Sequence, residues 1–173
     1  MKLLKILIVA AIILVVAGFF LPQGYIVSRE LVIKAPVDEI HQRVEDINGW
    51  ERWTIWDEAE PPAGSRKGGM ESGIGSGKYF SGTSGSGWFV ISNSSVTDGF
   101  EYAVYSDNGD KATAIVTFLD LDGETRVTWT VKGIVKSPPV LAPYIALSKE
   151  FVLGSSLSQN LKNLKKKFTQ ADM

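Results

Sequence analysis

Three tryptophans, Trp50, Trp53 and Trp56, recur at every third residue of one short segment. This spacing places their side chains on one side of a tight helical turn. Indoles gathered in this way either close one end of a hydrophobic core or stack on an apolar ligand. In the second case, we expect Trp53 or Trp56 to line the mouth of a cavity.

Other aromatic and branched residues lie in segments with the alternation of β-strands, and one face of these strands can line a cavity. Core packing is the alternative role for each of them. With the tryptophans, the candidate ligand-binding residues are Trp53, Trp56, Tyr79, Phe89, Ile91, Tyr102, Val104, Phe118, Trp129, Leu147 and Phe151.

Acid or base chemistry has one weak candidate, Glu150, which falls on the same predicted helical stripe as Leu147 and Phe151. A carboxylate on such a face would be desolvated and its pKa raised. Alternatively, Glu150 points to water or pairs with Lys149 or Arg126. We therefore assign no catalytic residue from the sequence.

Composition excludes several classes of function. The chain has no cysteine and one histidine, His41, so thiol chemistry and histidine-rich metal sites are excluded. Its formal net charge of -1 provides no basic field for nucleic acid. The glycines of Gly73–Lys78 do not match the spacing of a phosphate-binding loop. We predict no metal, no cofactor and no nucleic-acid partner.

The N-terminus carries a run without charged or polar side chains from Ile6 to Leu21, preceded by Lys2 and Lys5. About 20 apolar residues span the hydrocarbon core of a bilayer, which favours a transmembrane anchor. A cleaved signal peptide is the alternative, with small residues at Val16-Ala17-Gly18. The positive-inside rule predicts a cytoplasmic N-terminus in the inner membrane and an extracytoplasmic domain. We expect an anchor over residues 1–22 and one domain over 23–173.

The domain alternates strands with turn residues before a long C-terminal helix. Asp107–Asp110 and Asp122–Glu124 have the composition of tight hairpin turns, which favours an antiparallel sheet. We predict strands at Tyr25–Lys34, Phe100–Ser106, Ala112–Leu121 and Thr125–Val135, with short glycine-bent strands between Gly64 and Gly87.

Two helices are predicted in this domain. The first begins at Pro36 and ends at Asn48-Gly49. The second runs from about Pro143 to Gln170. Its stripe toward the sheet is predicted to contain Leu147, Phe151, Gly154, Leu157, Leu161, Leu164 and Phe168.

This order of elements resembles the helix-grip fold of the SRPBCC superfamily, in particular its START-like polyketide cyclase/dehydrase branch. Four segments carry the resemblance: Ala35-Pro36 through Asp46 with the tryptophans; Gly73-Ile74-Gly75 with Tyr79 and Phe80; Asp122 to Trp129; and Gly154 to Lys165. The implied fold is α+β, with a curved antiparallel sheet wrapped around the long C-terminal helix and one transmembrane helix before it.

The resemblance also implies a cavity between sheet and helix that takes an apolar or aromatic ligand. The expected function is therefore a membrane-anchored binding protein for a hydrophobic small molecule such as a lipid or isoprenoid. Two alternatives remain open: an enzyme of the polyketide cyclase or dehydratase type, and a non-enzymatic envelope stress or assembly protein.

Overall fold

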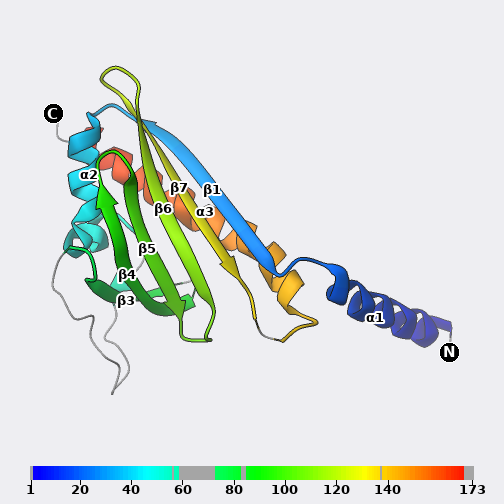
Figure 1. Cartoon of the computed structure of the whole chain (residues 1–173). Coiled ribbons are helices and arrows are strands. Elements are labelled where there is room, and N and C mark those ends of the chain that lie inside the picture. The colour runs from blue at the N-terminus through cyan, green and yellow to red at the C-terminus, as the bar shows by residue number, and fades with distance from the viewer. Residues whose placement is uncertain (1, 56, 59–72, 83–84, 137, 170–173) are drawn as a thin grey trace.

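A computed structural model describes residues 2–55, 57–58, 73–82, 85–136 and 138–169 of the chain. Within this part, a seven-stranded antiparallel sheet with the order β1-β7-β6-β5-β4-β3-β2 curves around helix α3 (Ala142–Thr169), as Figure 1 shows. The predicted α+β architecture, with a curved antiparallel sheet and a long C-terminal helix, is confirmed.

The strands lie close to their predicted positions because the turn residues between them are unambiguous. Asp122 and Gly123, at the β6–β7 turn, have φ angles of 61° and 94°, the left-handed backbone that tight hairpins require. The bounds are β1 (Gly24–Ile33), β2 (Asp57–Glu58), β3 (Gly77–Gly82), β4 (Gly85–Ser95), β5 (Gly99–Ser106), β6 (Lys111–Asp120) and β7 (Thr125–Ile134).

The first and last strands in sequence, β1 and β7, pair along their whole length, from Gly24 opposite Ile134 to Ile33 opposite Thr125. Val27 and Ile33 on β1 are almost completely buried in the core. The Thr125 hydroxyl donates a 2.7 Å hydrogen bond to the Ala35 carbonyl, which fixes the chain where it leaves β1.

The first helix of the domain, α2 (Val37–Glu45), is shorter than predicted. Its last hydrogen bond runs from the Asp46 backbone N–H to the Gln42 carbonyl. The helix ends because Asp46 has a ψ of 80°, outside the helical range, and a separate 3₁₀ helix, η1 (Ile47–Arg52), follows. Gly49 lies inside η1, where a Cβ atom would come within 2.6 Å of the Asp46 carboxylate. The prediction that Asn48-Gly49 ends a single helix is therefore wrong.

The predicted apolar stripe of α3 is right in the C-terminal half and wrong in the N-terminal half. Leu157, Leu161 and Leu164 are buried against the sheet, whereas Leu147 and Phe151 are exposed. Eighteen residues make five turns of about 3.6 residues each, so the face of Leu164 returns at Ala146, which is buried. The predicted stripe used an average step of about 3.5 residues and drifted off this face.

Helix α1 (Lys2–Phe20) projects from the domain and is the one helix of the described residues whose length and composition suit a membrane crossing (Figure 1). It contacts the start of α3: the Tyr144 hydroxyl donates a 2.6 Å hydrogen bond to the Leu14 carbonyl. Gly18 packs so closely there that a Cβ atom would lie 2.6 Å from the Val140 carbonyl oxygen.

Candidate functional site

An aromatic cluster fills the space between η1 and the sheet, and Trp50 stands at its centre. The Trp50 ring lies 5.0 Å from Phe89, 5.4 Å from Tyr102 and 5.6 Å from Trp53, measured between ring centroids. Its indole N–H donates a 2.7 Å hydrogen bond to the Val44 carbonyl, so the ring is fixed in orientation. At this end the fold is closed by side chains.

A small pocket lies between the sheet and the N-terminal half of α3, with a volume of about 60 Å³. An engineered apolar cavity that binds benzene measures about 150 Å³, so the pocket as it stands accepts only a few water-sized groups. It is lined by Tyr25, Phe80, Phe89, Tyr102, Val104, Ser106, Asp110, Lys111, Ala112, Val131, Lys149 and Leu153.

One wall of this pocket is apolar and aromatic, and Tyr102 belongs to it. The Tyr102 hydroxyl accepts a 3.1 Å hydrogen bond from the Trp129 indole N–H. Complete burial raises the pKa of Tyr102 far above its ordinary value, so the phenol stays neutral at physiological pH. This places a neutral hydroxyl, held by an indole, at the inner end of the pocket.

The other wall is polar and lies beside the β5–β6 hairpin. Burial, with a smaller contribution from the charge of Asp110, raises the pKa of Tyr25. Asp110 joins the hairpin to the segment after β7, because it accepts hydrogen bonds from the Asn108 amide and from the Lys136 backbone N–H. Lys149 is the cation that this wall offers to a ligand, because the Lys111 ammonium lies over the Tyr105 ring, 5.4 Å from its centroid, toward the outer face of the sheet.

Of the residues predicted to bind a ligand, Phe89, Tyr102 and Val104 line this pocket. Trp53, Ile91 and Trp129 are buried in the core and do not line the pocket, while Phe118 is partly buried and packs against the core. Trp56 lies outside the described residues.

Tyr79 lies on the opposite face of the sheet from the predicted one. It stands directly across from Trp88, whose ring centroid is 5.6 Å away, while its neighbour Phe80 faces the pocket. The Tyr79 hydroxyl donates a short hydrogen bond to Asp107. That bond raises the pKa of Tyr79 and, together with one from Ser86, lowers the pKa of Asp107.

Leu147 and Phe151 also lie away from the pocket, on the outer side of α3, with 59% and 81% of their surface exposed. Glu150 pairs with Arg29 across a 2.8 Å contact, and its side chain is 52% exposed. Arg29 was not among the partners expected for Glu150. The carboxylate is therefore neither desolvated nor directed into the pocket.

Several residues that shape the pocket were missed from the sequence. Tyr25 was predicted only as the start of a strand and Lys149 only as a possible partner of Glu150, while Leu153 was not singled out. Gly133 makes room for Tyr25, since a Cβ atom at that position would lie 2.7 Å from the Tyr25 hydroxyl. This contact joins β1 to β7, which are distant in sequence.

Asn160 is a second missed position, and it lies deep in the contact of α3 with the domain. Its side-chain oxygen accepts a 2.8 Å hydrogen bond from the Ile55 backbone N–H. The Asn160 amide nitrogen and the Trp53 indole nitrogen are buried and find no hydrogen-bond partner among the described residues. An asparagine between Leu157 and Leu161 was the sequence signal, because polar groups in an apolar stripe are expensive to bury.

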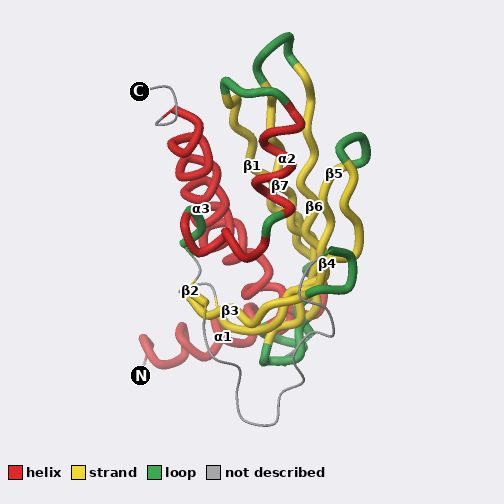
Figure 2. Tube along the Cα trace, turned by 90° about the vertical axis from the view of Figure 1, so that its left-hand side faces the viewer, coloured by secondary structure: helices red, strands yellow, loops and turns green. Residues whose placement is uncertain are grey.

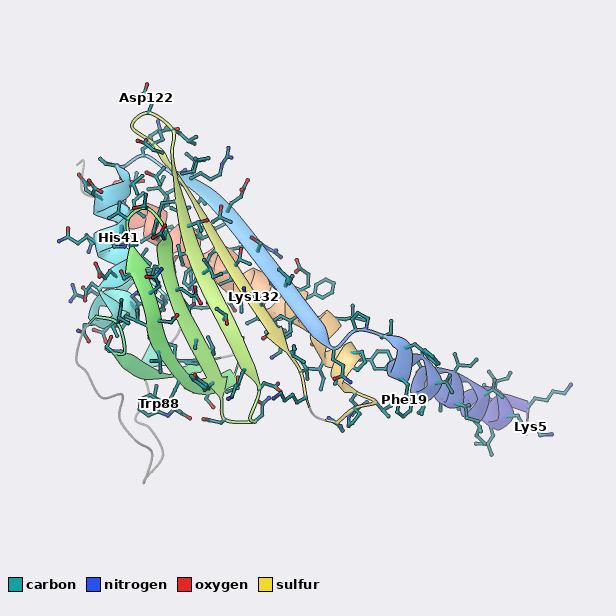
Figure 3. All side chains as sticks on the ribbon, viewed as in Figure 1. Lys5, Phe19, His41, Trp88, Asp122 and Lys132 are labelled. Atoms are coloured by element: carbon teal, nitrogen blue, oxygen red, sulfur yellow. The ribbon has the colours of Figure 1, made fainter. Side chains whose placement is uncertain are left out.

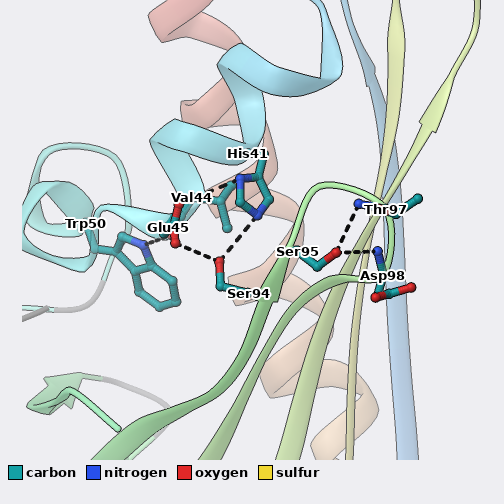
Figure 4. A network of polar contacts seen from close by, with 8 residues as sticks. All are labelled: His41, Val44, Glu45, Trp50, Ser94, Ser95, Thr97 and Asp98. Carbon is teal, nitrogen blue, oxygen red and sulfur yellow. Dashed lines mark hydrogen bonds and ion pairs between the residues drawn. The ribbon is translucent and has the colours of Figure 1, made fainter. Parts of the chain in front are cut away.

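His41, the single histidine, takes part in contacts that hold α2 against the sheet (Figure 4). Its ring is buried, lies 5.7 Å from Phe118 in an edge-to-face arrangement and approaches the Ser94 hydroxyl at 3.3 Å. Ser94 in turn donates a 2.9 Å hydrogen bond to Glu45. These contacts tie α2 to β4, far from the pocket described above.

The outer face of the sheet carries a larger and more open hollow of about 860 Å³. Lys111, Lys132 and Lys136 line it together with Ile26 and Ile134, and Lys132 is labelled on this face in Figure 3. The described residues contain no group of three histidine, cysteine, aspartate or glutamate side chains arranged to hold a metal ion.

No family model matches the chain, and no curated protein matches it significantly in sequence. Solved structures do match its fold. Protein MLL2253 from Mesorhizobium loti superposes with a TM-score of 0.61 and 12% identity, over 86% of this chain and 99% of that one. TTHA0849 from Thermus thermophilus gives a TM-score of 0.59 and 15% identity, over 86% of this chain and 99% of that one.

DynU16, a protein of the dynemicin biosynthetic locus, is a third structural neighbour. Its TM-score is 0.57 at 15% identity, over 82% of this chain and 46% of DynU16. At such identities the similarity concerns the fold alone, since one fold hosts many functions. The chain has the α+β helix-grip fold, with a curved antiparallel sheet around the C-terminal helix and an apolar helix at its N-terminus.

Proposed function

We propose that this protein is a membrane-anchored binding protein for a small hydrophobic molecule, lipid or isoprenoid in character, taken up beneath α3. The observation that carries the proposal is the pocket between the sheet and α3, with Phe89 and Tyr102 on one side and Lys149 on the other. Such a wall composition suits an apolar body with a polar or acidic head group.

Uptake of a ligand requires the pocket to widen, because about 60 Å³ is far below the 300–1,000 Å³ typical of ligand sites. Tyr25, Lys149 and Leu153 are only partly buried, so their side chains can move without disturbing the aromatic cluster. Helix α1 would hold the domain at a membrane, with the N-terminus cytoplasmic and the domain extracytoplasmic.

A pair of substitutions on β6 tests the proposal. Ala112 lines the pocket and also borders the outer hollow, whereas Thr113 next to it lines the outer hollow and not the pocket. Purified full-length protein is titrated with the fluorescent probe N-phenyl-1-naphthylamine, followed by displacement with fatty acids and isoprenols. We expect Ala112→Leu to abolish saturable binding and Thr113→Leu to retain it, with unchanged circular dichroism in both. Absence of saturable binding by the unmodified protein, or full binding by Ala112→Leu, would refute the proposal.

The enzyme alternative depended on a desolvated carboxylate at Glu150, and the ion pair with Arg29 removes that support. Tyr102 is no substitute as a proton carrier, since its raised pKa keeps it neutral and its hydroxyl is engaged by Trp129.

A further inference from the structure

The outer face of α3 carries apolar side chains beside the point where α1 joins the domain. Tyr144, Leu147 and Phe151 follow at intervals of three and four residues, so they lie on one face of the helix. Leu147 and Phe151 are exposed by 59% and 81%, which is unusual for two large apolar side chains so close together.

This face is continuous with the contact between α1 and α3. The Tyr144 hydroxyl, on the same face, bonds the Leu14 carbonyl of α1, and Leu14 and Gly18 are neighbours on the surface of that helix. In Figure 2, α1 leaves the domain toward the side of the sheet that α3 covers. A bilayer crossed by α1 would therefore lie along the outer face of α3.

The charge of α3 also fits such a surface. The helix contains five lysines and one acidic residue, Glu150, which is already paired with Arg29. Lys162 lies 18 residues after Tyr144, about five helical turns, so it continues the same face beyond Phe151. Lys162 and Lys166 are exposed and make no ion pair with any described residue. Cations near a bilayer surface are attracted by anionic head groups.

We propose that the outer face of α3 lies on the anionic lipid bilayer, with Leu147 and Phe151 inserted at the boundary of head groups and acyl chains and with Lys162 and Lys166 at the head groups. The inference rests on the membrane anchor of the proposed function and adds the bilayer as the partner of this face. The domain would then lie flat against the membrane, as amphipathic interfacial helices do.

Single spin labels test this orientation cleanly, because the chain has no cysteine of its own. Full-length protein is reconstituted in vesicles of phosphatidylethanolamine and phosphatidylglycerol, with a label at one position in each sample. Position 151 reports on the proposed surface, position 13 on α1, and position 119 on an exposed site of β6. Oxygen, which partitions into lipid, and a water-soluble nickel chelate are compared as relaxing agents.

We expect labels at 151 and at 13 to be relaxed more by oxygen than by nickel, and the label at 119 to show the reverse order. Reversing charge with Lys162→Glu and Lys166→Glu should shift the label at 151 toward nickel in these vesicles and have no effect in purely zwitterionic ones. If the label at 151 is as accessible to nickel as the label at 119 while position 13 lies in lipid, the docking of α3 is overturned and the anchor is not. A label at 13 in water overturns the anchor as well, whereas a negative result in ligand binding leaves the docking intact.

Discussion

Removal of the Phe89 ring should both destabilise the domain and enlarge its pocket. Phe89 is 4% exposed, lines the pocket and packs on Trp50, Tyr102 and Phe80 at centroid distances of 5.0, 5.6 and 6.4 Å. Phe89→Ala loses about 2 kcal/mol of transfer free energy. It loses about 2 kcal/mol more for a void of about 90 Å³. We therefore expect the free energy of unfolding to fall by about 4 kcal/mol.

The same substitution should make the pocket accept a small aromatic molecule. Joined to the existing space of about 60 Å³, the new void reaches about 150 Å³, the size of an apolar cavity that binds benzene. Toluene at 100 times its dissociation constant should then restore about 2.7 kcal/mol. Urea unfolding in detergent micelles, followed by near-ultraviolet circular dichroism with and without toluene, measures both effects.

Phe100→Ala is the matched control, because Phe100 is fully buried in the same aromatic cluster but does not line the pocket. Phe100→Ala should lower the free energy of unfolding by a similar amount, and toluene should restore much less of it. If the free energy of unfolding of Phe89→Ala falls by less than about 1.5 kcal/mol, the surrounding side chains have closed the space and no void forms. Equal protection of the two variants by toluene would refute the idea that Phe89 separates the pocket from the aromatic core.

Three further outcomes follow from single contacts. Tyr102→Phe removes the acceptor of the Trp129 indole N–H and should lower the free energy of unfolding by about 1 kcal/mol, measurable by urea unfolding. Hydrogen bonds from Tyr79 and Ser86 lower the pKa of Asp107, so the stability from this contact is present above the ordinary Asp pKa and is lost as pH falls through the lower folded value. Carboxyl titration by NMR should therefore show a higher Asp107 pKa in Tyr79→Phe. An unchanged Asp107 pKa in that variant would contradict the assignment. In Gly154→Ala, the new methyl group contacts only the flexible end of the Arg29 side chain. The gain of about 1 kcal/mol in helix propensity offsets the loss of the ion pair between Arg29 and Glu150, so the melting temperature should barely change. Gly87→Ala meets the Tyr105 backbone carbonyl at 2.2 Å and should melt far lower, which makes the two glycines a matched pair in a thermal scan.

Local patterns in the sequence were sufficient to predict where most strands and the N-terminal helix lie. The hairpin turns at Asp107–Asp110 and Asp122–Glu124 require backbone conformations that few residues adopt, so the strands beside them could be placed within about one residue. The apolar run before Pro22 likewise predicted α1 from composition. These features depend on neighbouring residues only, which is why one sequence determined them.

The faces of those elements depended on contacts between distant segments. Tyr79 and Phe80 differ by one position, and the pairing of β3 with β4 decides which of them faces the pocket. A one-residue change of register exchanges the two faces of a strand. On α3, a small error in helical period, accumulated over six turns, moved Leu147 and Phe151 from the expected inner face to the outer one.

The sequence by itself therefore determined the apolar N-terminal helix, the order of strands and helices and the α+β class, because these follow from local composition and turn chemistry. Only the tertiary structure decided that Trp50 and Trp53 fill the core and that Arg29 pairs with Glu150. It also decided that Tyr25 and Lys149 border the pocket. The ion pair and the border of the pocket depend on how β1 and α3 come together across more than a hundred residues, and no local pattern encodes that approach.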